Sequence, residues 1–108
     1  MKRCFQIHPA DNVATLLEDA DREPLQIIGQ KPQVVIDAVE AIALGHKVAL
    51  KSIAVDAPVI KYGATIALAT IAIEAGQWVH LHNSRSQLDE RSNRLDLHTG
   101  VAKDTVYG

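Results

Sequence analysis

The chain has 108 residues, 47% of them hydrophobic and 22% charged, which is enough for one globular domain with its own core. A formal net charge of −2 without a basic face argues against nucleic acid as a partner. The single cysteine, Cys4, excludes an intramolecular disulfide. Because no segment has the apolar length of a membrane span or the pattern of a signal peptide, we expect a cytoplasmic protein.

Short strands separated by turns are predicted along most of the chain. Apolar and β-branched residues indicate strands in the first third, over residues 4–8, 25–29 and 33–36, and either a short strand or a helical turn over residues 13–17. Residues 37–41 offer the best place for a helical turn, and the lack of long amphipathic helices disfavours a βαβ architecture. The sequence therefore predicts a compact, mostly β fold with short strands and at most short helical turns.

A degenerate pattern occurs three times in the middle of the chain, over residues 42–48, 53–60 and 71–79. Each copy runs from isoleucine and alanine through a Gly or Pro turn into a strand. Gly45 and Gly76 are expected to supply backbone angles that side chains resist, and Pro58 to preset the equivalent turn. The spacing is too irregular for a solenoid. We expect one device used repeatedly, in which an isoleucine enters the core and the chain turns.

Two histidines stand two positions apart in residues 78–83, a segment that predicts a strand. Side chains at i and i+2 of a strand share a face, so His80 and His82 would lie beside Trp78. Val79 and Leu81 would then face the core. Two imidazoles on one face form half of a metal site or a paired acid/base site. The alternative is a pair of satisfied polar side chains on a sheet surface.

Other histidines could complete such a site. His46 follows the turn at Gly45 and opens a strand over residues 46–50, which makes it a candidate third ligand of an open three-histidine site. The alternative is a turn histidine bonded to backbone. His8, held extended by Pro9, is a weaker candidate.

The lysines at positions 47 and 61 are the cations expected near the histidines. Lys61 could clamp a substrate carboxylate, and Tyr62 could donate a proton or orient a hydroxyl. Alternatively, both side chains cover the edge of a sheet. Asn83 either forms hydrogen bonds beside the histidines or starts a turn.

After Asn83 the composition becomes polar. We therefore predict a folded domain over residues 1–83 and an extended tail over residues 84–108, which is solvated or lies on another subunit. His98 falls in this tail.

Four segments, residues 8–14, 45–50, 59–66 and 79–83, carry a family resemblance in this order. With them the chain resembles the small N-terminal SAF-type module of the altronate/galactarate dehydratase family. The same module occurs as a separate small subunit in altronate dehydratases and in sulfolactate sulfo-lyases. Gly-His-Lys-Val-Ala-Leu, beginning at Gly45, and Lys-Tyr-Gly, beginning at Lys61, are its most specific motifs here.

The resemblance implies a β-clip fold and a hydro-lyase that acts on a sugar acid. It implies a divalent metal ion, iron(II) first, with manganese(II) or zinc(II) as alternatives, and a large dehydratase subunit that completes the active site. Within it, the metal ligands would be His46, His80 and His82. The catalytic residues would be His46, Lys47, Lys61 and Tyr62, and the substrate-binding residues Lys61 and Asn83.

Two other functions stay open at this point. The chain could be the small subunit of a sulfolactate sulfo-lyase, in which the leaving group is sulfite, or a non-catalytic carbohydrate-binding or scaffolding module. Exposed strand edges in a small β fold also favour a homodimer.

Overall fold

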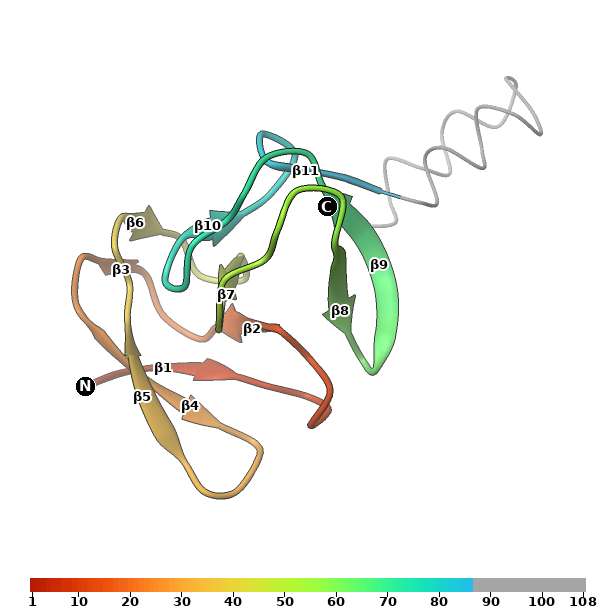
Figure 1. The fold of residues 1–108 in the computed structure, drawn as a ribbon. Helices are drawn as coiled ribbons and strands as arrows, with labels where there is room; N and C mark the ends of the chain where they lie inside the picture. Colours follow the sequence, from red (N-terminus) through yellow and green to blue (C-terminus); the bar gives the residue numbers. More distant parts are fainter. Residues whose placement is uncertain (87–108) are drawn as a thin grey trace, which may run out of the picture.

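The computed structural model describes residues 1–86, and within them the chain forms strands and no helix (Figure 1). The mostly β class predicted from the sequence is confirmed. This part of the chain therefore contains no helix with the length and apolar character needed to cross a membrane. In chain order the strands are β1 (Lys2–Phe5), β2 (Val13–Leu16), β3 (Ala20–Asp21), β4 (Pro24–Ile28), β5 (Val34–Asp37), β6 (Ala41–Ile42), β7 (Lys47–Ala49), β8 (Pro58–Lys61), β9 (Ala64–Ala69), β10 (Trp78–Val79) and β11 (Ser84–Ser86).

Most of these strands join two sheets. The larger sheet has the order β10-β7-β2-β1-β4-β5, in which β1 and β4 are parallel and the other neighbours antiparallel. The smaller sheet has the order β11-β9-β8, and β3 pairs with β6 separately. The hairpin of β8 and β9 stands beside the larger sheet, next to β2 and β7 (Figure 1).

Two apolar clusters form the core, and strands β2 and β7 contribute to both. On β2 and β7, Leu16 and Val48 face one cluster, whereas Val13 and Ala49 face the other. This alternation is the period of two that a strand imposes on its side chains. The two strands therefore lie between the clusters, and Lys47, at the start of β7, lines a hollow with Val59 and Ala67 of the second cluster.

The repeated pattern corresponds to three buried isoleucines, each followed by a tight turn, although the third copy starts at Ile73 and not at Ile71, which is 55% exposed. The isoleucines that enter the core are Ile42, Ile53 and Ile73. Each turn is closed by a backbone hydrogen bond of 2.9–3.1 Å across four residues, and its third residue has a positive φ, as type II turns require. That residue is Gly45, Asp56 or Gly76. In the second copy Asp56 thus provides the turn, whereas Pro58, which was expected to do so, opens β8.

Substituting the turn glycines tests this arrangement. A Cβ atom at Gly76 would overlap the carbonyl oxygen of Asp37, whereas at Gly45 it would meet nothing within 4 Å. Both residues have φ near +90°, so alanine adds comparable backbone strain at either site. We expect Gly76→Ala to lower the free energy of unfolding by about 3 kcal/mol or more, and Gly45→Ala by about 1 kcal/mol. Urea denaturation measures both, and equal losses would contradict the expectation.

Two predicted boundaries are corrected by the structure. Residues 37–41 form no helical turn, because the backbone amides of Ala38 and Val39 donate to Glu23 and Gly76 in other segments. Ser84–Ser86, assigned to the polar tail, instead forms β11 and pairs with β9. Along β11 the buried side chains of Ser84 and Ser86 alternate with the exposed side chain of Arg85. All three residues are polar, so the sequence shows no apolar–polar alternation here. The rest of the predicted tail lies outside the described residues.

Cys4 is completely buried in the core of the larger sheet. Burial disfavours the thiolate and raises the pKa of this thiol to about 11. We therefore expect no reaction with a thiol reagent at pH 8 in the folded chain, and one reactive thiol per chain after unfolding. Rapid labelling of the native chain at a rate typical of free thiols would contradict this prediction.

Candidate functional site

Four aromatic rings meet at the pairing of β7 and β10 and the turn after it. Trp78 is stacked on His80 with 5.2 Å between ring centroids and 10° between planes. His82 lies 4.8 Å from the same indole, and His46 contacts it edge-on at 5.5 Å. The rings of His46 and His80 are 5.3 Å apart. The predicted grouping of His80 and His82 with Trp78 is therefore present, and His46 joins it.

A tight turn produces this grouping, not the predicted strand over residues 78–83. Strand β10 ends at Val79, and the chain turns at residues 80–83, so Leu81 is 63% exposed instead of facing the core. Asn83 stabilises the turn, because its Oδ1 accepts from the His80 amide at 3.0 Å and its Nδ2 donates to the Trp78 carbonyl at 2.8 Å. Asn83 is buried, with 3% exposure, in the turn that carries the histidines, and its predicted substrate contact stays a prediction.

Lys47 lies beside His80, and Lys61 lies near Lys47. Lys47 is half-buried and lines a small hollow together with His80, Ser84 and Ser86. Burial, followed by the nearby charge of Lys61, lowers the pKa of Lys47 below its ordinary value. Lys61 ends β8, with its Nζ 4.9 Å from the centre of the Tyr62 ring. Within residues 1–86, neither lysine forms an ion pair with a carboxylate.

His80 is kept uncharged by its surroundings. Partial burial lowers the pKa of this imidazole, and the nearby His46, Lys47 and His82 lower it further. Because an ordinary histidine titrates near pH 6.5, His80 is neutral at pH 7 and keeps a free lone pair. The site thus combines two cationic lysines with a neutral base.

The turn that carries Lys61 and Tyr62 is positioned by residues that the sequence analysis missed. Tyr62 and Gly63 both have a positive φ and form the two-residue loop between β8 and β9, as a type I′ turn requires. Asp11 accepts from the Gly63 amide at 2.8 Å, and Asn12 accepts from the Ile60 amide at 2.7 Å. Both polar residues are 5% exposed. The sequence signal for this role is the pair of adjacent polar residues, Asp11 and Asn12, directly before the apolar residues of β2.

His8 is not part of the ring cluster. It packs against Gly63, and its Nδ1 accepts from the Ala10 amide at 3.0 Å. Tyr62 is 61% exposed at the tip of its hairpin. His98 lies outside the described residues.

The donor set for a metal ion is incomplete here. Imidazole nitrogens suit iron(II), manganese(II) or zinc(II) only when they converge on one point. His46, His80 and His82 instead surround the indole of Trp78, and in residues 1–86 no three His, Cys, Asp or Glu side chains are grouped to hold a metal ion. The three-histidine metal centre therefore stays a prediction, one that these residues do not satisfy on their own.

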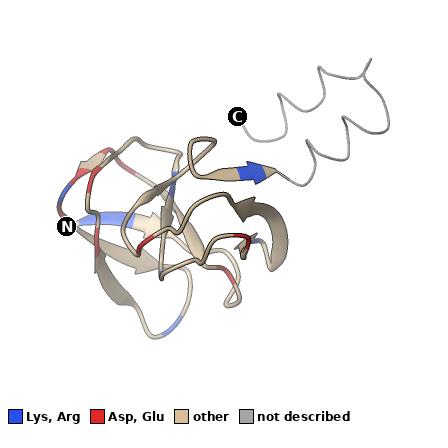
Figure 2. Ribbon diagram, turned by 45° about the horizontal axis from the view of Figure 1, so that its top comes forward, with Lys and Arg blue, Asp and Glu red and all other residues tan. Residues whose placement is uncertain are grey.

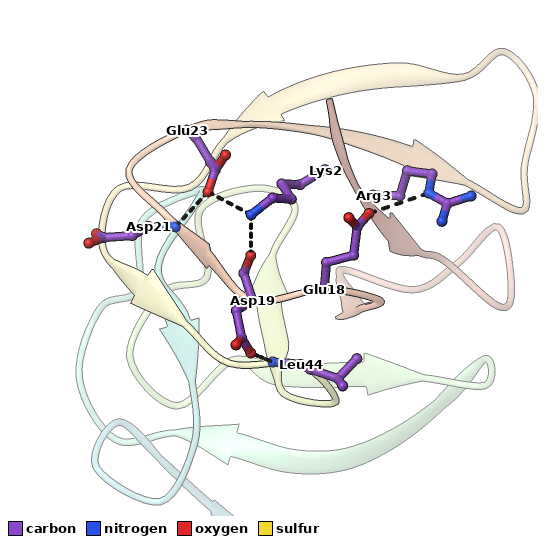
Figure 3. Close-up of polar contacts among 7 residues, drawn as sticks. All are labelled: Lys2, Arg3, Glu18, Asp19, Asp21, Glu23 and Leu44. Carbon is purple, nitrogen blue, oxygen red and sulfur yellow. Dashed lines mark hydrogen bonds and ion pairs between the residues drawn. The ribbon is translucent and has the colours of Figure 1, made fainter.

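A larger hollow, of about 600 Å³, is lined by His46 and Trp78 together with residues of β3 and β6. Lys2, the lysine that lines this hollow, already has partners. Its Nζ is 3.3 Å from Glu23 and donates to the Asp19 carbonyl at 2.6 Å (Figure 3). Asp19 also accepts from the Leu44 amide at 2.8 Å, which fixes the turn before His46 (Figure 3). Lysine and arginine are otherwise scattered over the molecule (Figure 2). In residues 1–86, Lys47 and Lys61 have no such carboxylate partner.

An all-β module with clustered histidines and a half-buried lysine between its two sheets is the class of protein that this geometry defines. The family model for the altronate/galactarate dehydratase SAF domain matches residues 2–87. The chain belongs to this family, as its motifs predicted.

Its relatives are lyases. The chain is 36% identical over 91 residues to the altronate dehydratase of Bacillus subtilis (strain 168), covering 83% of this chain and 18% of that protein. It is 41% identical over 87 residues to the altronate dehydratase of Escherichia coli (strain K12), covering 80% and 17%. It is 30% identical over 88 residues to the (2R)-sulfolactate sulfo-lyase subunit alpha of Chromohalobacter salexigens, covering 77% and 94%. The chain thus spans less than a fifth of the altronate dehydratases that it matches.

Proposed function

We propose that the chain is the small SAF part of a sugar-acid dehydratase, and that a larger dehydratase subunit completes its active site. The observation that supports this proposal is the placement of two lysines: Lys47 lines a hollow with the neutral imidazole of His80, and Lys61 lies close enough to Lys47 to lower its pKa. The family relation supports the lyase chemistry, and the short length matched in the altronate dehydratases supports the need for a larger part.

The lysines bind the substrate carboxylate in this proposal. An anion entering between Lys47 and Lys61 would relieve the repulsion of the two ammonium groups and meet cations that need no rearrangement. When the adjacent carbon loses its proton, negative charge spreads onto the carboxylate as an enediolate. Preorganised positive charge at that position stabilises the transition state more than the ground state.

His80 accepts the proton in the same proposal. The base takes the hydrogen from the carbon next to the carboxylate, and the electron pair of that bond forms the carbon–carbon double bond. The hydroxyl on the neighbouring carbon leaves with its bonding pair and, after gaining a proton, becomes water. A base works best when its lone pair is free at the working pH, which the lowered pKa of His80 ensures.

In this proposal, a metal ion would be bound only in the complete enzyme. The described residues do not form a three-ligand site, so any metal would take ligands from the larger subunit.

A chimera tests the proposal. The matched region of this chain replaces the corresponding region of the E. coli altronate dehydratase, and dehydration of altronate is measured as formation of the keto product. Activity that is lost on Lys61→Met but kept on the exposed control Lys51→Met is expected. A chimera that stays fully active with Met at positions 47 and 61 and Ala at position 80 would favour a non-catalytic module.

A second candidate is the small subunit of a sulfolactate sulfo-lyase. The observation that favours it is length, because the match covers 94% of the sulfo-lyase subunit alpha. The lysine pair would bind the carboxylate of sulfolactate in the same way, and the leaving group would be sulfite. Sulfite release by the chain reconstituted with a sulfo-lyase large subunit, without altronate activity in the chimera, would select this candidate.

A further inference from the structure

Trp78 is held rigidly at the centre of the ring cluster. Its backbone amide donates to Glu40 at 3.0 Å, and its carbonyl accepts from Asn83 at 2.8 Å. Its ring is sandwiched by contacts with the imidazoles of His46, His80 and His82. Glu40 and Asn83 thus fix the backbone of Trp78, so the indole presents its N–H in one direction.

That direction is toward His46. The indole Nε1 lies 3.2 Å from Nδ1 of His46, within hydrogen-bond distance. An indole nitrogen can only donate, so Nδ1 of His46 must accept. A neutral imidazole has one N–H and one lone pair, and a lone pair at Nδ1 places the proton on Nε2.

The backbone of His46 keeps this geometry in place. Its amide donates to the Ala43 carbonyl at 3.0 Å, and its carbonyl accepts from the Leu16 amide at 2.8 Å. Asp19 fixes the turn just before it through the Leu44 amide. Backbone bonds on both sides thus hold His46 opposite the indole.

We infer that Trp78 is a positioning residue that holds neutral His46 as the Nε2–H tautomer, so that His46 offers a hydrogen-bond donor to a substrate oxygen. The donor role rests on the proposed function, whereas the tautomer rests only on the geometry of this chain. His46 and His80 then have different tasks: His46 donates, and His80 keeps the lone pair.

This assignment conflicts with His46 as a metal ligand or a base through Nε2. Either role needs a lone pair at Nε2, which would move the proton to Nδ1 and set two N–H groups against each other at the indole contact. The hydrogen bond to Trp78 would have to break first. With this tautomer, His80 and His82 are the predicted metal ligands that remain.

Nuclear magnetic resonance of the full chain, labelled with ¹⁵N, tests the tautomer without any activity assay. The spectra are taken about two pH units above the ordinary histidine pKa of about 6.5, where imidazoles are neutral. We expect the proton of His46 on Nε2 and a scalar coupling across the hydrogen bond between Trp78 Nε1 and His46 Nδ1. Trp78→Phe, which keeps an aromatic ring but has no donor, should abolish the coupling. A proton on Nδ1 of wild-type His46, or no coupling, would overturn the proposal.

Kinetics of the chimera test the donor role separately. Trp78→Phe should lower kcat about tenfold with little change in KM, as expected for loss of one orienting hydrogen bond. His46→Gln, which keeps an amide donor near the position of Nε2, should retain clearly more activity than His46→Leu. Equal loss in both His46 variants would overturn the donor role, even where the tautomer is confirmed.

Discussion

Lys47→Met is expected to lower kcat/KM of the altronate dehydratase chimera by about 10²- to 10³-fold, the usual effect of removing one preorganised group that stabilises developing negative charge. Methionine keeps an unbranched apolar chain in the half-buried position beside His80 but has no ammonium group. Both kcat and kcat/KM should fall, because the missing charge acts most strongly on the enediolate-like transition state.

The same substitution should not destabilise the fold at pH 7. Burial and Lys61 lower the pKa of Lys47 in the folded chain, so the unfolded chain binds its proton more tightly. The charged lysine therefore opposes folding below the folded pKa, and this penalty disappears as pH rises from there toward the ordinary value. Lys47→Met removes the penalty, so its advantage over wild type should be largest at neutral pH and shrink near pH 10.

Activity and stability must be measured together for this prediction. Urea denaturation at pH 7 and pH 10 gives the free energies of unfolding, and Lys51→Met provides a control on an exposed lysine. A Lys47→Met chain that unfolds more easily than wild type at pH 7 would show a structural role for the ammonium group. Unchanged kcat/KM would remove Lys47 from the active site.

The sequence predicted the elements that depend on local pattern. Alternation located β2, β4 and β5 within one or two residues, and the repeated isoleucines were found because each is followed by a positive-φ turn. It failed where long-range hydrogen bonds decide the conformation. Ala38 and Val39 join other segments through their amides, and residues 80–83 turn because the Asn83 side chain bonds back to Trp78 and His80.

The site was only partly visible for a similar reason. His46, Lys47, Lys61 and His80 were found because polar residues interrupt apolar strands at specific motifs. The structure groups His46 and Lys47 with His80, and Lys61 lies near Lys47. The hydrogen bond from Trp78 to His46 joins residues 32 positions apart, which spacing alone does not reveal. Asp11 and Asn12 looked like an ordinary turn, although their side chains bond to a hairpin about 50 positions away.

Asp11→Ala is expected to be among the most destabilising single substitutions in the described part of the chain. The buried carboxylate accepts from the Gly63 amide at 2.8 Å and from the His8 amide at 3.0 Å. Hydrogen bonds to a charged group contribute about 1.5–3 kcal/mol each, so alanine should lower the free energy of unfolding by about 3–5 kcal/mol. The amides of Gly63 and His8 would lose their partner, and the hairpin carrying Lys61 would lose one of its ties to the loop before β2.

Function should suffer from the same change even where the chain remains folded. In a chimera that retains its fold at low temperature, a released hairpin would let Lys61 move away from Lys47, which should raise KM for the acid. Asp37→Ala, at an exposed carboxylate at the end of β5, is the matched control and should change stability by less than about 0.5 kcal/mol. An Asp11→Ala chain within 1 kcal/mol of wild type by urea denaturation would show that water replaces the carboxylate. In that case the position of Lys61 would depend on the β8–β9 pairing and on the hydrogen bonds between Asn12 and β8.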